Sequence, residues 1–188
     1  MTTLKQMKKT VLALIEELNP DSEYLTDDPD IQAKINDVVN LVQLELSRMK
    51  KIADVTTEIF EEATTYKLSE KIENFYQLNI LRFKTPEGEA GDFELIDDII
   101  MFNEAGIATI FYYRTPKIIT SETLDEHVLE ISDDALGIMP YGVAADLLKS
   151  DVSANYGQIY QQKYETMLQR LDPRYSKGSI VIEGGVDI

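Results

Sequence analysis

Acidic side chains are the most abundant groups in this sequence that could do chemistry, but they have few partners for it. The chain has 34 Asp and Glu residues, one histidine and no cysteine. One histidine without cysteine cannot form a histidine-rich metal site or a histidine-paired thiol nucleophile. Because His127 lies in a polar stretch, we expect it on the surface.

The acidic segment 26–30 could supply calcium ligands. A calcium loop that begins at Asp28 needs glycine at its sixth position and glutamate at its twelfth. Ala33 and Val39 occupy those two positions, so the pattern fails. A turn followed by a helix cap accounts for the segment instead.

No other spacing of reactive residues indicates a catalytic or cofactor site. Asp97 and Asp98 fall inside a strand pattern, where neighbouring side chains point to opposite faces and do not share one ion. The sequence contains no phosphate-binding glycine loop and no serine nucleophile elbow. A carboxylate-pair hydrolase stays open as an alternative, because many acid pairs exist and no spacing singles one out. We therefore expect no enzyme activity, no catalytic residue, no cofactor and no bound metal.

The residues best suited to a role are those that could contact other protein chains. They are Ile180, Val181, Ile182, Tyr156, Tyr160, Lys5, Lys8 and Lys9. The β-branched run near the C-terminus is typical of an arm that adds a strand to another subunit, and a frayed terminus is the alternative. The lysines come early in a helix, where its dipole disfavours cations, so they could meet an acidic partner or face solvent. The tyrosines share one side of the last helix.

The net charge of −16 is unevenly distributed. Residues 52–135 carry 6 basic and 19 acidic side chains, whereas the segments on either side are nearly balanced. A chain this acidic does not grip phosphates by displacing counterions, and an acidic lining would let nucleic acid slide past. A general solubility surface is the alternative reading. The sequence contains neither a signal-peptide pattern nor an apolar run long enough to span a membrane.

Hydrophobic periodicity predicts the elements that would position these residues. We expect helices at about 3–18, 29–50, 135–149 and 154–171, and strands near 55–59, 66–68, 76–83, 93–102, 107–114 and 129–131. The expected fold class is mainly α with a β-rich insertion. Helices from residues 1–51 and 133–172 would form one bundle, residues 52–132 an acidic β-rich insertion, and residues 173–188 an extended C-terminal arm.

Four segments carry a resemblance to a known family. Residues 112–116 read YYRTP, residues 138–148 read IMPYGVAADLL, residues 160–168 read YQQKYETML, and residues 66–78 read YKLSEKIENFYQL. In this order and spacing, they resemble motifs of the head-to-tail adaptor (connector) proteins of tailed bacteriophages. The match departs at Ser69, where the family usually has proline.

The resemblance implies a structural role in the neck of a virion. Such adaptors form a ring, generally of about twelve subunits, beneath the portal protein at the capsid vertex. The ring extends the DNA channel, through which DNA passes without specific binding, and docks the next neck or tail-completion protein. The implied partners are the portal protein, that next protein and further copies of this chain, with no membrane and with synthesis in the host cytoplasm. A tail-completion or stopper protein of the same virion, or a non-viral interaction module, are the alternatives.

Overall fold

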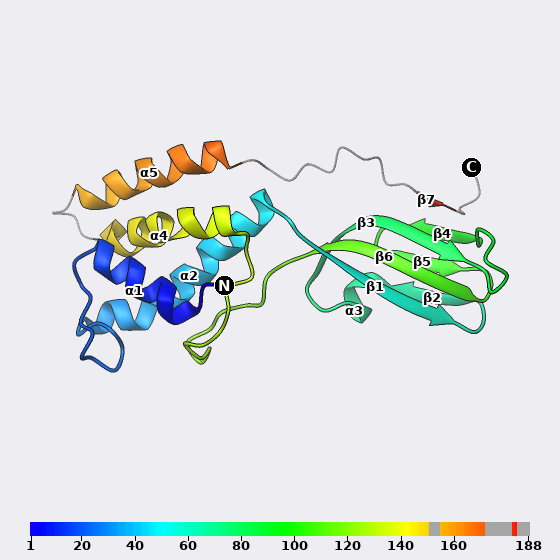
Figure 1. Cartoon of the computed structure of the whole chain (residues 1–188), viewed down its shortest axis with the longest axis horizontal. Helices are drawn as coiled ribbons and strands as arrows, with labels where there is room; N and C mark the ends of the chain where they lie inside the picture. Colours follow the sequence, from blue (N-terminus) through cyan, green and yellow to red (C-terminus); the bar gives the residue numbers. More distant parts are fainter. Residues whose placement is uncertain (151–154, 172–181, 184–188) are drawn as a thin grey trace. The chain divides into compact units, whose positions relative to one another are not determined.

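The computed structural model describes residues 1–150, 155–171 and 182–183. The chain divides into two compact units (Figure 1). The helical unit comprises Met1–Lys50 and the chain from Pro116 through the last helix. The β unit comprises Lys51–Thr115 together with a short strand from the C-terminal end.

The expected fold class, mainly α with a β-rich insertion, is wrong. The chain is a mixed α/β protein with 41% helix and 26% strand. Residues 51–115 hold two sheets around a hydrophobic core of their own, so the strands form a second unit beside the helical one. The expected extended arm at 173–188 lies outside the described residues except for its strand at Ile182–Glu183.

Four helices make up most of the helical unit. They are α1 (Leu4–Leu14), α2 (Pro29–Met49), α4 (Asp133–Leu147) and α5 (Tyr156–Arg170), and the 3-10 turn η1 (Leu148–Ser150) follows α4. Thr3 and Gln6 form a capping box at the start of α1, and the Asp28 carboxylate caps α2 by accepting hydrogen bonds from the Asp30 and Ile31 amides. Glu16, with a φ of 63°, ends α1 before its expected end at residue 18.

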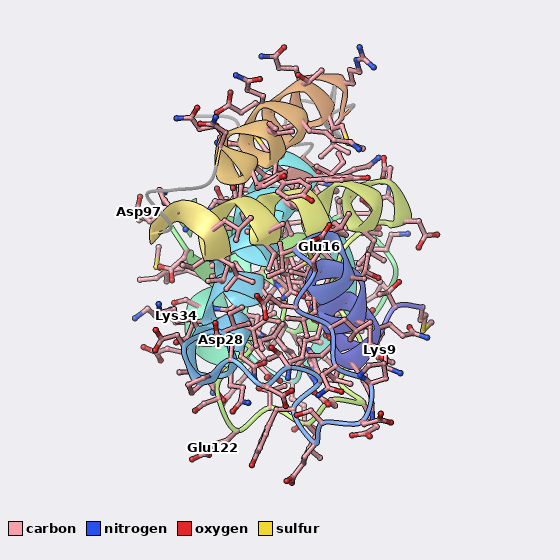
Figure 2. All side chains as sticks on the ribbon, turned by 90° about the vertical axis from the view of Figure 1, so that its left-hand side faces the viewer. Lys9, Glu16, Asp28, Lys34, Asp97 and Glu122 are labelled. Atoms are coloured by element: carbon pink, nitrogen blue, oxygen red, sulfur yellow. The ribbon has the colours of Figure 1, made fainter. Side chains whose placement is uncertain are left out.

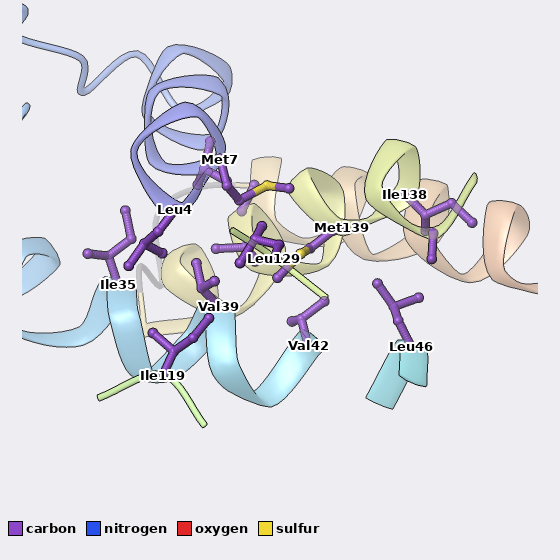
Figure 3. Packing of buried hydrophobic residues seen from close by; sticks show 14 of the residues in the cluster. Leu4, Met7, Ile35, Val39, Val42, Leu46, Ile119, Leu129, Ile138 and Met139 are labelled. Carbon is purple, nitrogen blue, oxygen red and sulfur yellow. The ribbon is translucent and has the colours of Figure 1, made fainter. Parts of the chain in front are cut away.

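Helix α4 is the centre of the helical unit. It packs against α1, α2 and α5, and eight of its residues are buried. Figure 3 shows Met7 of α1, Val39 and Val42 of α2, and Met139 of α4 meeting in this core. The other three helices are therefore arranged around the buried α4, and helices from both ends of the chain share one core.

The segment 116–132, expected in the β-rich insertion, lies in the helical unit. Polar side chains of α2 hold it by its backbone. Asn36 donates to the Thr120 carbonyl at 2.8 Å, and Gln43 donates to the Lys117 carbonyl at 3.1 Å. Asn40 Oδ1 accepts from the Ile119 amide at 2.9 Å. The strand expected at 129–131 is absent from this segment, where only a single bridge joins Val128 to Thr3.

The β unit contains seven described strands and a short helix. They are β1 (Ile52–Phe60), β2 (Thr64–Lys67), α3 (Leu68–Lys71), β3 (Phe75–Lys84), β4 (Phe93–Ile96), β5 (Ile99–Phe102), β6 (Gly106–Arg114) and β7 (Ile182–Glu183). One sheet has the order β1-β6-β3-β7 and the other has the order β2-β5-β4. Side chains from both sheets share one core, in which the Phe83 and Phe102 rings lie 4.6 Å apart.

Two turns set where the strands of the β unit end. Gly88 has a φ of 86° and its amide donates to the Thr85 carbonyl at 2.9 Å, which closes a turn after β3. The single strand expected at 93–102 is wrong, because Asp97 and Asp98 form a turn that splits it into β4 and β5. Asp97 has a φ of 55°, which a continuous strand does not allow.

Candidate assembly surfaces

The C-terminal strand β7 adds to the edge of the larger sheet. It pairs in parallel with β3, with Ile182 opposite Leu81 and Glu183 opposite Arg82. An edge strand presents free amide and carbonyl groups that another strand can complete. Of the three residues expected to add a strand, Ile182 lies in β7, whereas Ile180 and Val181 lie outside the described residues.

The three lysines of α1 have different surroundings. Lys8 donates to Asp125 Oδ1 at 2.8 Å, and only 14% of its side chain is exposed. This ion pair holds α1 against the segment that returns to α4, so Lys8 acts within the fold. Lys5 and Lys9 are exposed, and Figure 2 shows Lys9 on the outside of its helix.

The two tyrosines of α5 also differ. The hydroxyl of Tyr160 donates to the Leu14 carbonyl at the end of α1, and its ring stacks on that of Tyr141 with centroids 6.4 Å apart. Tyr160 therefore fixes α5 in place. Tyr156 stands one turn earlier and is 65% exposed, with Ile159 exposed beside it. Of the two tyrosines of α5 expected to contact other chains, Tyr156 is the one whose side chain is exposed to a partner.

Tyr164, the fifth residue of the motif at 160–168, has a polar partner that the motif does not reveal. Its hydroxyl donates to Glu45 Oε2 of α2 at 2.7 Å. Burial and the neighbouring Glu45 carboxylate raise the pKa of Tyr164 above its usual range. The ring lies over Gly142 of α4, where an added Cβ would be 2.8 Å from Cε2 of the ring. The glycine within the apolar run 138–148 was the available signal for this close approach.

An open pocket of about 260 Å³ lies in the helical unit, near Asp28 and Lys34 in Figure 2. Its lining residues are Glu17, Asp28, Asp30, Ile31, Lys34, Leu147 and Leu148. The Asp28 carboxylate is already engaged, because it accepts from two amides as the cap of α2. Within residues 1–150, 155–171 and 182–183, no group of three or more acidic or histidine side chains is placed to hold a metal ion.

His127 is half-buried rather than at the surface as expected. Its backbone carbonyl accepts from the Leu4 amide at 2.8 Å, which joins it to the start of α1. Its Nε2 atom is buried and has no hydrogen-bond partner among the described residues. The residue therefore belongs to the packing of the segment 116–132 against α1.

No protein-family model matches this sequence, and no curated protein matches it either. The resemblance to phage adaptors stays a prediction from the motifs. In the structure, the YYRTP motif spans the end of β6, and the motif at 138–148 forms most of α4. None of the helices in the described part of the chain has the length and apolar character needed to cross a membrane.

Proposed function

We propose that this protein is a structural head-to-tail adaptor of a tailed phage, which forms a ring beneath the portal protein and docks the next neck or tail-completion protein. The observation that carries the proposal is the pairing of β7 with the edge of β3. An edge that accepts a strand from its own chain accepts the same strand from a neighbouring copy at little cost in free energy. Strand exchange of this kind links subunits around a ring.

The exposed part of α5 supports the same proposal. Tyr160 and Tyr164 tie this helix to α1 and α2 by hydrogen bonds, so its exposed residues are held in fixed positions. Tyr156 and Ile159 form a pair of large exposed side chains one turn apart. Aromatic side chains on a rigid element are typical of protein contacts. We assign the protein no catalytic role, cofactor or metal.

The charge of the chain suits a place beside packaged DNA. With a net charge of −16, the protein lacks the excess of cations that binds the phosphate backbone. A ring with this charge extends the channel and lets DNA pass without specific binding. In this proposal the mature protein is located in the neck of the virion.

The proposal is tested by the native mass of the full chain mixed with the portal protein encoded beside it. We expect a portal ring that carries about twelve copies. Ile182→Pro removes the amide group of β7 and should reduce the number of copies bound, whereas Ile182→Val keeps the amide and serves as the matched control. If an intact portal ring binds no copies of the wild-type chain, the proposal fails, and a stopper or tail-completion role takes its place.

A further inference from the structure

In the described part of the chain, β1 is a long sheet edge whose outer side has no strand paired with it. Strand β1 lies beside β6 (Figure 1) and ends the order β1-β6-β3-β7 of the larger sheet. It pairs with β6 at nine consecutive positions without a register shift. The outer side of such a strand presents unpaired amide and carbonyl groups, which another extended chain can complete.

The other edges of the β unit are shorter or already paired. At the opposite end of the larger sheet, β3 has two register shifts against β6 and pairs with β7. The two edges of the smaller sheet, β2 and β4, have four residues each. Short strands, bulges, proline and lysine are common protections of a sheet edge. Strand β1 has nine residues and contains no proline, glycine, lysine or bulge, so it lacks these protections.

The free backbone groups of β1 belong to Ala53, Val55, Thr57 and Ile59. In an antiparallel pair, the residues alternate between pointing their amide and carbonyl groups towards the partner strand and away from it. The Val55 amide points away from β6, because it donates to the Oδ1 atom of Asp54 at 2.8 Å. The other three residues are an even number of positions from Val55 and share its direction. All four are exposed, so an incoming strand can reach their backbone groups.

The C-terminal half of β1 is acidic. Glu58 accepts a hydrogen bond from the Tyr66 hydroxyl at 3.3 Å, and Glu61 and Glu62 follow the strand directly. These three glutamates form no ion pair with a described residue. Lys84, at the same end of the sheet, lies two strands away on β3. A side chain that an added strand places opposite Glu58 is therefore favoured if it is cationic.

The charges at the N-terminal end of β1 are already balanced or point elsewhere. Asp54 accepts a hydrogen bond from Arg114 Nε at 3.1 Å. The Lys51 ammonium group donates to Gln77 of β3 at 2.7 Å and lies 4.9 Å from the centre of the Tyr113 ring of β6. Lys51 thus reaches across the sheet and away from the outer side of β1. The edge consists of a neutral half and an acidic half.

This distribution of charge opposes the pairing of β1 with β1 of a second copy. A full-length antiparallel pair centred on Thr56 would place Asp54 of each copy opposite Glu58 of the other. Like charges directly opposite each other destabilise a sheet. Nucleic acid is disfavoured too, because its binding needs cations that displace counterions from phosphates. The occupant that fits is an extended protein segment with lysine or arginine at one end and β-branched residues along the rest.

We propose that β1 binds such a basic extended segment of another protein as an added strand. The segment runs antiparallel to β1, which is the more stable direction, and its cationic end lies opposite Glu58 and beside Glu61 and Glu62. The Val55 amide then exchanges the carboxylate of Asp54 for a carbonyl group of the added strand. This site is distinct from the β3 edge that carries the adaptor proposal, and it does not depend on that role.

The test uses the isotope-labelled full chain and two peptides, KVKVTVTV and EVEVTVTV, which differ only in the charge of their first and third side chains. In the antiparallel register, the third side chain of each peptide lies opposite Glu58. Amide resonances of the four outward residues of β1 are followed by NMR. We expect KVKVTVTV to shift these resonances and slow their hydrogen exchange at a severalfold lower concentration than EVEVTVTV.

Variants of β1 separate backbone pairing from charge. Thr57→Pro removes an outward amide and spares the ladder with β6, so it should abolish peptide binding, whereas Thr57→Val keeps the amide and serves as the matched control. Glu58→Lys should reverse the preference between the two peptides, which tests the charge match even if Thr57→Pro fails to fold.

Five results would overturn the proposal. They are equal binding of the two peptides, no shift in β1, and binding that survives in a folded Thr57→Pro chain. Resonances of β1 that shift with protein concentration alone would indicate self-pairing as the use of this edge. Slow exchange of the outward amides before any peptide is added would mean that another segment of the same chain covers it.

Discussion

The close approach of α5 to α4 at Gly142 leads to a sharp prediction about stability. A Cβ at this position would lie 2.8 Å from Cε2 and 3.0 Å from Cδ2 of the Tyr164 ring. The ring cannot move aside easily, because it is 4% exposed and its hydroxyl is bonded to Glu45. Gly142→Ala therefore forces α5 away from α4 or breaks that hydrogen bond.

Two opposing effects set the size of the change. Overpacking a core costs about 1–3 kcal/mol, while alanine in place of glycine inside a helix gains about 1 kcal/mol. The sum leaves Gly142→Ala destabilised by about 0–2 kcal/mol. Gly137 lies in the same helix and has no heavy atom within 4 Å of its added Cβ. Gly137→Ala receives the helical gain alone and should be stabilised by about 1 kcal/mol.

The measurement is urea unfolding of the full chain, monitored by the circular dichroism signal of its helices. The two variants are compared where the slopes of their unfolding free energy against urea concentration are equal. We expect the free energy of unfolding of Gly137→Ala to exceed that of Gly142→Ala by about 1–3 kcal/mol. Equal stabilisation of the two variants would refute the reasoning, because it would mean that the Tyr164 ring does not constrain position 142.

Two further predictions concern the segments that surround α2. Gln43→Leu leaves the Lys117 carbonyl without its buried donor. It should lower the free energy of unfolding by about 1–3 kcal/mol in the same urea assay. An unchanged free energy of unfolding would contradict the role of Gln43. The hydrogen bond from the Lys50 ammonium group lowers the pKa of Asp134 to about 2. Because the folded pKa lies below the unfolded one, the stabilisation is complete above about pH 4 and is lost as the pH falls towards 2. Asp134→Asn should lack this part of the acid dependence, and salt should shrink the difference because the pair is partly exposed.

The parts of the fold that follow local rules could be predicted from the sequence. Helix α2 begins at Pro29, as expected, because a capping Asp and a proline at the first helical position mark it. The end of α1 was missed, since Glu16 takes a left-handed backbone conformation that nothing in its side chain favours. The split of β4 from β5 was missed although Asp97 has a positive φ, which Asp tolerates better than most residues, so the Asp97–Asp98 pair was an available turn signal.

Long-range contacts explain most of the other errors. The segment 116–132 was expected beside the strands, but it follows α2 because Asn36, Asn40 and Gln43 bind its backbone groups. Lys8 was expected at a partner surface and instead pairs with a carboxylate 117 residues away. Single-sequence patterns do not report such pairings. The fold class failed because periodicity identified the strands without revealing that they close around a core of their own.

The division of the chain into two units has a consequence for the order in which they form during synthesis. The β unit is nearly continuous in sequence, so its strands from β1 to β6 are synthesised one after another without an intervening helical segment of the other unit. The helical unit is interrupted, because the apolar stripes of α1 and α2 are covered by α4, which begins only at Asp133. A nascent chain therefore completes its middle first and carries two uncovered helices until α4 emerges.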